Sequence, residues 1–207
     1  MDKAKGYLNI EVAYEKAVSE FAGLSPKVVA ENSASAYRTE EGCIELYFIT
    51  SPYRVYHPSG EVYDSSGDKV NLYLSTILLH YLNTADGTPL ASKWVTFKEL
   101  PGGSIYQEAF FGRAQKPFLA NFGEQPEKFM EAAKALGGFK QDIAPYCMVI
   151  PVLPRVPVAF VLSPGDEEIG ASCTILFDAN APSYLPTEDY AHLPGMVIKE
   201  MARQVKK

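Results

Sequence analysis

The sequence predicts an α+β fold, with a mainly antiparallel sheet and packed helices in a single domain over residues 1–207. Short runs of branched and aromatic residues are separated by turn residues, a pattern typical of antiparallel strands. Other segments repeat apolar residues at steps of three and four, which indicates helices. No internal repeat, low-complexity segment or linker divides the chain, so one domain is the expectation.

The N-terminal segment is predicted to form a helix followed by a small antiparallel sheet. An apolar stripe from Ile10 to Leu24 predicts an amphipathic helix that ends near Gly23. Strands are expected to follow at 33–37, 43–49, 53–57 and 61–63. Residues 64–68 lack the ligand spacing and the closing glutamate of a calcium loop, so a solvated turn is predicted there.

The middle of the chain is predicted to be mostly helical. From Val70 an apolar stripe indicates a buried helix that is closed by Asp86 and Gly87. A short strand at 93–97 contains the only tryptophan, Trp94, and the aromatic run at 106–122 suggests two short helices. A further helix is expected to begin at Pro126, and strand character returns at 144–152.

Residues 154–190 combine two apolar strand patterns, a turn and many of the acidic residues. Apolar runs at 156–162 and 174–177 predict antiparallel strands that an acidic loop joins. Thr187 is expected to be the N-cap of a helix, because two acids in its first turn suit the helix dipole. Pro194 is expected to separate that turn from a last helix at 196–205.

Charge and cysteine content exclude several classes of function. A net charge of −6 and a pI near 5.2 argue against nucleic-acid binding, which requires a basic surface. No stretch approaches the ~18 apolar residues of a membrane helix. The three cysteines are far apart and lie in apolar runs, as reduced cysteines of a cytoplasmic protein do, and no paired motif among them predicts a metal.

Carboxylates are the main candidates for chemistry. The predicted acidic residues are Asp166, Glu167, Glu168, Asp178, Glu188 and Asp189. If their loops reach the same edge of the sheet, they form an acidic pocket for a divalent metal or for acid–base catalysis. The alternative is that a solvated hairpin loop and a helix N-terminus favour acids without any site. No nucleophile motif accompanies His57, His80 or His192.

Two arginines and two aromatic residues complete the candidate binding residues. Arg113 and Arg155 lie in apolar surroundings, where each is suited either to a ligand's carboxylate or phosphate or to a structural salt bridge. Trp94 and Tyr106 belong to the aromatic segment that leads to Arg113. Aromatic residues at such spacing form a core more often than a ligand site.

The chain resembles the domain-of-unknown-function 3786 family from about Ile44 onward. The similar blocks are Leu79–Leu82, Gly87–Leu90, Lys93-Trp94, Phe97, Glu99–Gly103, Tyr106, Phe110, Arg113, Pro154–Pro157, Gly165–Glu168, Leu176–Asp178 and Tyr184–Asp189. The resemblance implies a protein of anaerobic bacteria and archaea, which is sometimes joined to an iron-sulfur domain of the kind found in corrinoid proteins. It implies no known reaction, and this chain lacks the cluster-binding cysteine block of those fusions.

The leading hypothesis is therefore a cytoplasmic binding or accessory protein of anaerobic metabolism. The family context implies a corrinoid or iron-sulfur protein of methyl transfer as the partner, which is an analogy and not a result of the pattern. The alternative is a carboxylate- or metal-dependent enzyme with a pocket around Asp166, Asp178 and Glu188. A plain interaction domain without a small-molecule site is the third reading.

Overall fold

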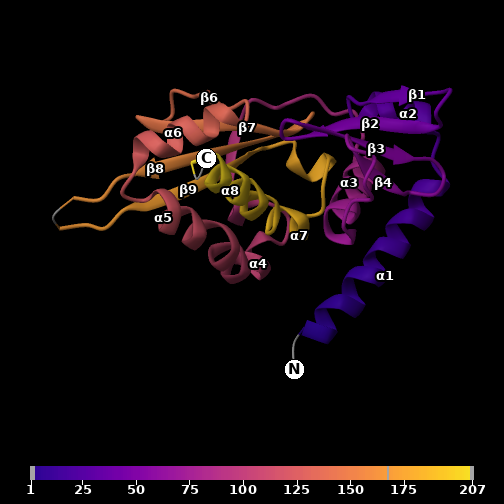
Figure 1. The fold of residues 1–207 in the computed structure, drawn as a ribbon. Coiled ribbons are helices and arrows are strands. Elements are labelled where there is room, and N and C mark those ends of the chain that lie inside the picture. Colours follow the sequence, from indigo (N-terminus) through magenta and orange to yellow (C-terminus); the bar gives the residue numbers. More distant parts are fainter. Residues whose placement is uncertain (1–2, 167, 206–207) are drawn as a thin grey trace. The chain divides into compact units, whose positions relative to one another are not determined.

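The computed structural model describes residues 3–166 and 168–205 and confirms the α+β prediction (Figure 1). It contains two antiparallel sheets with packed helices. The chain divides into two compact units. Unit 1 comprises Met1–Pro89 and Ser183–Leu185, and unit 2 comprises Leu90–Pro182 and Pro186–Lys207. The single-domain assignment stays a prediction.

Unit 1 is a four-stranded sheet with helices. Its elements are α1 (Lys3–Ala22), α2 (Pro26–Asn32), β1 (Ala36–Arg38), β2 (Cys43–Phe48), β3 (Ser51–Tyr56), β4 (Val62–Asp64) and α3 (Leu72–Thr84). The strand order is β1-β2-β3-β4, with every neighbouring pair antiparallel. Helix α1 packs against α3, and the Asn71 side chain accepts a hydrogen bond from the Leu74 N–H to cap α3.

The two faces of this sheet differ in polarity. Ile44, Val55 and Val62 pair across β2, β3 and β4 and are each no more than 1% exposed, so this face belongs to the core. One residue further along, Glu45 pairs with Arg54 and Arg54 pairs with Tyr63 on the opposite face. We call this second face, with its charged and tyrosine side chains, the polar face.

Unit 2 is a five-stranded sheet with a larger set of helices. The elements from Trp94 to Phe122 are β5 (Trp94–Thr96), the 3₁₀ turn η1 (Phe97–Glu99), α4 (Gly103–Phe110), the π-helical segment η2 (Phe111–Gln115) and α5 (Lys116–Phe122). Those that follow are α6 (Pro126–Ala135), β6 (Phe139–Lys140), β7 (Tyr146–Leu153), β8 (Val156–Ser163), β9 (Ser172–Asp178), the 3₁₀ turn η3 (Ala181–Ser183), α7 (Thr187–Tyr190) and α8 (Leu193–Gln204). The strand order is β5-β9-β8-β7-β6.

Aromatic rings join the helices of unit 2 to its sheet. Phe118 of α5 stacks on Phe160 of β8 with ring centroids 5.6 Å apart, and it also contacts the rings of Phe122 of α5 and Phe129 of α6. All four rings are no more than 1% exposed. Of the aromatic run at 106–122, Phe110, Phe118 and Phe122 are therefore core, whereas Phe111 is exposed and Tyr106 is half-buried. The contact with Phe160 positions α5 and α6 on the face of the sheet that carries this ring.

Some boundaries differ from the prediction. Thr187 is the first residue of α7 instead of its N-cap, and its hydroxyl donates a hydrogen bond to the Pro101 carbonyl at 2.7 Å. Pro194 lies in the first turn of α8 and does not separate a helix at 196–205 from the preceding turn, because proline is compatible with that turn. The predicted strand at 33–37 begins only at Ala36, after the unpredicted helix α2.

None of the helices within 3–166 and 168–205 is both long and apolar enough to cross a bilayer.

Candidate functional site

Asp178 stabilises the backbone around it through hydrogen bonds to its carboxylate. It is 3% exposed, and its carboxylate accepts hydrogen bonds from the backbone N–H groups of Ala91 and Ser92, both at 2.8 Å, and of Asn180 at 3.0 Å. These bonds hold the segment before β5 against the end of β9. The buried charge is thus compensated by backbone dipoles of unit 2.

Asp166 also accepts backbone hydrogen bonds, but it does so at the surface of the protein. It is exposed near the tip of the β8–β9 hairpin, and its Oδ1 accepts hydrogen bonds from the N–H groups of Ile169 and Glu168. The bonds from Ile169 and then Glu168 lower the pKa of the Asp166 carboxyl. This is a side-chain-stabilised turn, and Glu167 lies outside the described residues.

The predicted acidic pocket requires carboxylates that converge, and the structure separates them. Asp166 precedes β9 and Asp178 ends it, so the seven-residue strand, about 20 Å long, lies between them. Within residues 3–166 and 168–205 no group of three or more His, Cys, Asp or Glu side chains is arranged to hold a metal ion. Asp166 and Asp178 therefore lie too far apart to share a site.

Trp94 and Arg155 occupy structural positions. Trp94 pairs with Asp178 across β5 and β9, is half-buried, and packs against the buried cluster of Cys147, Val149 and Ala159. Arg155 is half-buried in the tight turn between β7 and β8. The indole is therefore largely committed to packing within unit 2.

The remaining predicted residues lie on helices that pack together. Tyr106 lies on α4 and is half-buried, whereas Glu188 is exposed and Asp189 is buried on α7, which packs against α4. Arg113 is exposed on η2, which packs against α8. A Cβ on Gly195 of α8 would come within 2.5 Å of the Arg113 carbonyl oxygen, so glycine permits this close approach.

His192 joins this group, although its sequence context carried no signal. Burial lowers the pKa of its imidazole to about 4, and the positive charge of Arg113 adds to that effect while Asp189 opposes it. The imidazole is consequently neutral at pH 7. Arg113, Asp189 and His192 thus interact electrostatically, and the structure brings together two predicted residues and one that prediction missed.

The three cysteines are all free thiols. Cys43 and Cys147 are buried and Cys173 is half-buried. Burial raises the pKa of Cys147 and of Cys173 to about 11, and it is also the main cause of a raised pKa for Cys43. Because the thiolate is the reactive form, none of the three is suited to nucleophilic chemistry near neutral pH.

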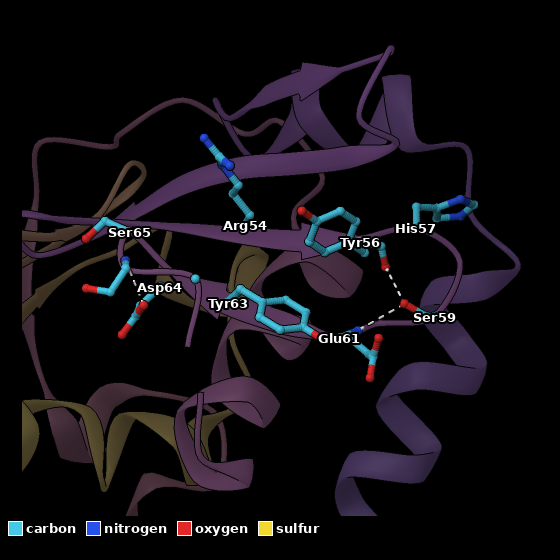
Figure 2. Close-up of a pocket in the computed structure, with 10 residues that line it drawn as sticks. Arg54, Tyr56, His57, Ser59, Glu61, Tyr63, Asp64 and Ser65 are labelled. Atoms are coloured by element: carbon cyan, nitrogen blue, oxygen red, sulfur yellow. Dashed lines mark hydrogen bonds between the residues drawn. The ribbon is translucent and has the colours of Figure 1, made fainter. Parts of the chain in front are cut away.

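A hollow of about 690 Å³ lies in unit 1, at the polar face of the sheet (Figure 2). It is formed by β3, β4 and the turns that flank β4. Its lining includes Arg54, Tyr56, Ser59, Glu61, Tyr63 and Asp64. We call it the Tyr56–Tyr63 hollow, after the two rings at its centre.

The two tyrosine rings meet at a right angle. The centroids of Tyr56 and Tyr63 are 5.6 Å apart and the ring planes make an angle of 89°. Ser59 supports the turn below them, because its hydroxyl donates to the Tyr56 carbonyl at 3.4 Å and accepts from the Glu61 N–H at 3.3 Å. Figure 2 shows the imidazole of His57 turned away from both rings, and its edge contacts Phe21 with centroids 5.2 Å apart.

The charged groups of the hollow already have partners. The Arg54 guanidinium is 3.5 Å from Glu41 and 3.9 Å from Glu45, and Figure 2 shows it directed away from the tyrosine rings. Glu61 pairs with Lys69 at 2.7 Å, and this hydrogen bond and charge lower the pKa of the Glu61 carboxyl. The hollow therefore presents aromatic rings and hydroxyl groups beside charged groups that are already paired.

Sequence reasoning missed this hollow although it recognised the strands that form it. The hairpin pattern predicts Tyr56 and Tyr63 only as strand residues. The available signal was the alternation of Arg54, Tyr56, Glu61 and Tyr63, which places polar side chains on one face of two paired strands. The predicted turn at 64–68 is present, with Asp64 accepting the N–H groups of Ser66 and Asp68.

Comparison with known proteins gives one family. The model of a family described as a domain of unknown function (DUF3786) matches residues 25–200. Searches of curated proteins and of solved structures gave no match.

Proposed function

The chain belongs to the DUF3786 family, whose description assigns no reaction, and on that premise we propose that it is a binding or accessory protein that recognises a protein partner through the Tyr56–Tyr63 hollow. The observation that carries this proposal is the perpendicular tyrosine pair within a polar hollow. The interpretation agrees with the leading hypothesis from the sequence, and it moves the binding site to residues that the hypothesis did not contain.

The composition of the hollow supports recognition of a protein. Tyrosine and arginine are enriched among the residues that dominate binding energy, and serine and glycine supply adaptable hydrogen bonds in binding loops. The hollow combines these types in Arg54, Tyr56, Tyr63, the serines at 59, 65 and 66 and Gly67. Tyr47, on the neighbouring strand β2, is 52% exposed and extends the tyrosine surface.

The partner that we propose is an iron-sulfur or corrinoid protein of anaerobic methyl transfer in the cytoplasm. Its support is the family resemblance alone. A second contact area is proposed around Arg113 in unit 2, because α4, η2, α7 and α8 pack together and carry Tyr106, Arg113, Glu188 and Asp189. Exposed Ile105, at 80%, and Phe111, at 51%, lie on the same helical segment and favour an interface there.

The test is anaerobic affinity capture with quantitative mass spectrometry and measurement of cobalt and iron in the captured fraction. Tyr56→Ala and Tyr63→Ala are each expected to reduce capture of the main partner by about tenfold, as the loss of a strong interface residue does. Tyr73→Ala, which changes a tyrosine of α3 that is 37% exposed and outside the hollow, is the matched control. Equal capture by the hollow variants and by the wild type would refute the proposed site.

Arg113→Ala in the same experiment tests the second area separately. A loss of capture with Arg113→Ala alone would place the interface in unit 2. Cobalt or iron that co-purifies in proportion to the partner supports the proposed class of partner. A metal-free partner would contradict it and leave the recognition function standing.

A further inference from the structure

The surroundings of the Tyr56–Tyr63 hollow are acidic. Between residues 36 and 69 the chain has six carboxylates and three cationic side chains, within a protein of net charge −6. Two of the carboxylates, those of Glu61 and Asp64, line the hollow itself. A surface of this charge attracts a partner with positively charged side chains and repels an acidic one.

The tyrosine pair offers a geometry that suits a cation. The face of an aromatic ring carries partial negative charge, and an ammonium or guanidinium group is attracted to it within about 6 Å. The two rings make an edge-to-face contact at 89° with centroids 5.6 Å apart, and we call this contact the corner. A cation on the face of one ring there would lie within reach of the other. Arg54 is directed away from this corner, toward Glu41 and Glu45.

An anion is disfavoured at the same place. The backbone N–H groups of Ser66 and Asp68, which would otherwise be available to an anion, both donate to the Oδ1 of Asp64. The lining guanidinium of Arg54 is shared between two glutamates. Lys69 is likewise paired, with its ammonium group 2.7 Å from the Glu61 carboxylate.

We propose that the Tyr56–Tyr63 hollow binds a lysine or arginine side chain of a protein partner, with the cation against the two tyrosine rings and near the carboxylates of Glu61 and Asp64. This inference rests on the proposed function and names the chemistry that the hollow recognises. Cation–π attraction would supply the ring contacts, and the acidic surroundings would supply the long-range attraction.

The test uses a tetralysine peptide, its fully acetylated form and a tetraglutamate peptide, with binding followed through the ring resonances of Tyr56 and Tyr63 in NMR titrations. Tetralysine is expected to shift both resonances, more weakly as the salt concentration rises from about 50 mM to about 500 mM. The acetylated and tetraglutamate peptides are expected to leave the two resonances unchanged. Equal shifts with tetraglutamate or with the acetylated peptide would overturn the assignment of a cation.

Substitutions at one ring separate the cation from a hydroxyl contact. Tyr56→Phe retains an aromatic face and is expected to bind tetralysine within about twofold of the wild type, whereas Tyr56→Leu is expected to weaken binding about three- to fivefold. Tyr73→Leu is the control for a tyrosine outside the hollow. Binding that falls equally in the phenylalanine and leucine variants would contradict the cation and indicate the hydroxyl.

The two proposals fail in different ways. If partner capture depends on Tyr56 but tetralysine neither binds nor competes with the partner, the cation is refuted while the recognition site stands. If capture is independent of both tyrosines, the proposed function fails whatever the peptides do.

Discussion

Replacement of Asp178 by alanine should strongly destabilise unit 2 without affecting the hollow in unit 1. The carboxylate accepts three backbone hydrogen bonds, from Ala91, Ser92 and Asn180, and the residue is 3% exposed. A buried donor that loses its partner costs about 1–3 kcal/mol, and partial access of water reduces the sum. We therefore expect Asp178→Ala to lower the free energy of unfolding by about 3–5 kcal/mol.

Urea unfolding followed by circular dichroism measures this change, and hydrogen exchange locates it. The amides of Ala91 and Ser92 should exchange much faster in Asp178→Ala, because their acceptor is gone. Asp178→Asn, which retains one acceptor oxygen, provides a milder variant if the alanine variant does not fold. Asp166→Ala is the control, since its two bonds lie in an exposed turn. A loss below about 1 kcal/mol in Asp178→Ala would refute the reasoning.

Three further predictions concern the pH dependence of stability, the reactivity of the thiols and the substitution of two glycines. The folded-state pKa of His192, about 4, lies below its usual 6.5, so its contribution to the free energy of unfolding should be fully present above pH 6.5. This contribution should be lost as the pH falls from 6.5 toward 4, by about 1–2 kcal/mol once the partial exposure of the imidazole is taken into account. His192→Phe should flatten this acid limb in pH-dependent urea unfolding. Cys147 and Cys173, with pKa values near 11, should react with iodoacetamide at pH 8 far more slowly in the folded than in the unfolded protein, by mass spectrometry. Gly103→Ala should lower the thermal midpoint because its Cβ would overlap the Phe97 carbonyl, whereas Gly112→Ala, in open space, should raise it slightly.

Much of the fold was predictable because its signals are local. The strands at 156–162 and 174–177 appear as β8 and β9, paired antiparallel as expected, because branched apolar runs around a turn suffice to indicate a hairpin. The helix that begins at Pro126 is also present. In contrast, the division into two sheets depends on which strands pair over long separations, as when β5 pairs with β9. No local pattern encodes that choice.

The site was less predictable than the fold because it depends on directions and distances. The sequence alone does not distinguish an aspartate that stabilises an exposed turn, such as Asp166, from one that accepts hydrogen bonds from partly buried backbone amides, such as Asp178. Sequence proximity suggested one pocket for both, and the length of β9 separates them. Tyr56 and Tyr63 become neighbours only through the register that pairs Arg54 with Tyr63, and the 89° between their ring planes depends on side-chain torsions that no sequence pattern encodes.

The segment Ser183–Leu185 has a consequence for how the protein is made. It belongs to unit 1 although residues of unit 2 precede and follow it, and its Tyr184 stacks on Tyr81 and donates a hydrogen bond to the Thr88 carbonyl. A ribosome synthesises the chain from the N-terminus, so most of unit 2 leaves the exit tunnel before the last segment of unit 1 does. Unit 1 therefore stays incomplete until Ser183–Leu185 has been synthesised. A nascent chain arrested before Tyr184 would leave empty the space that the Tyr184 ring fills beside Tyr81.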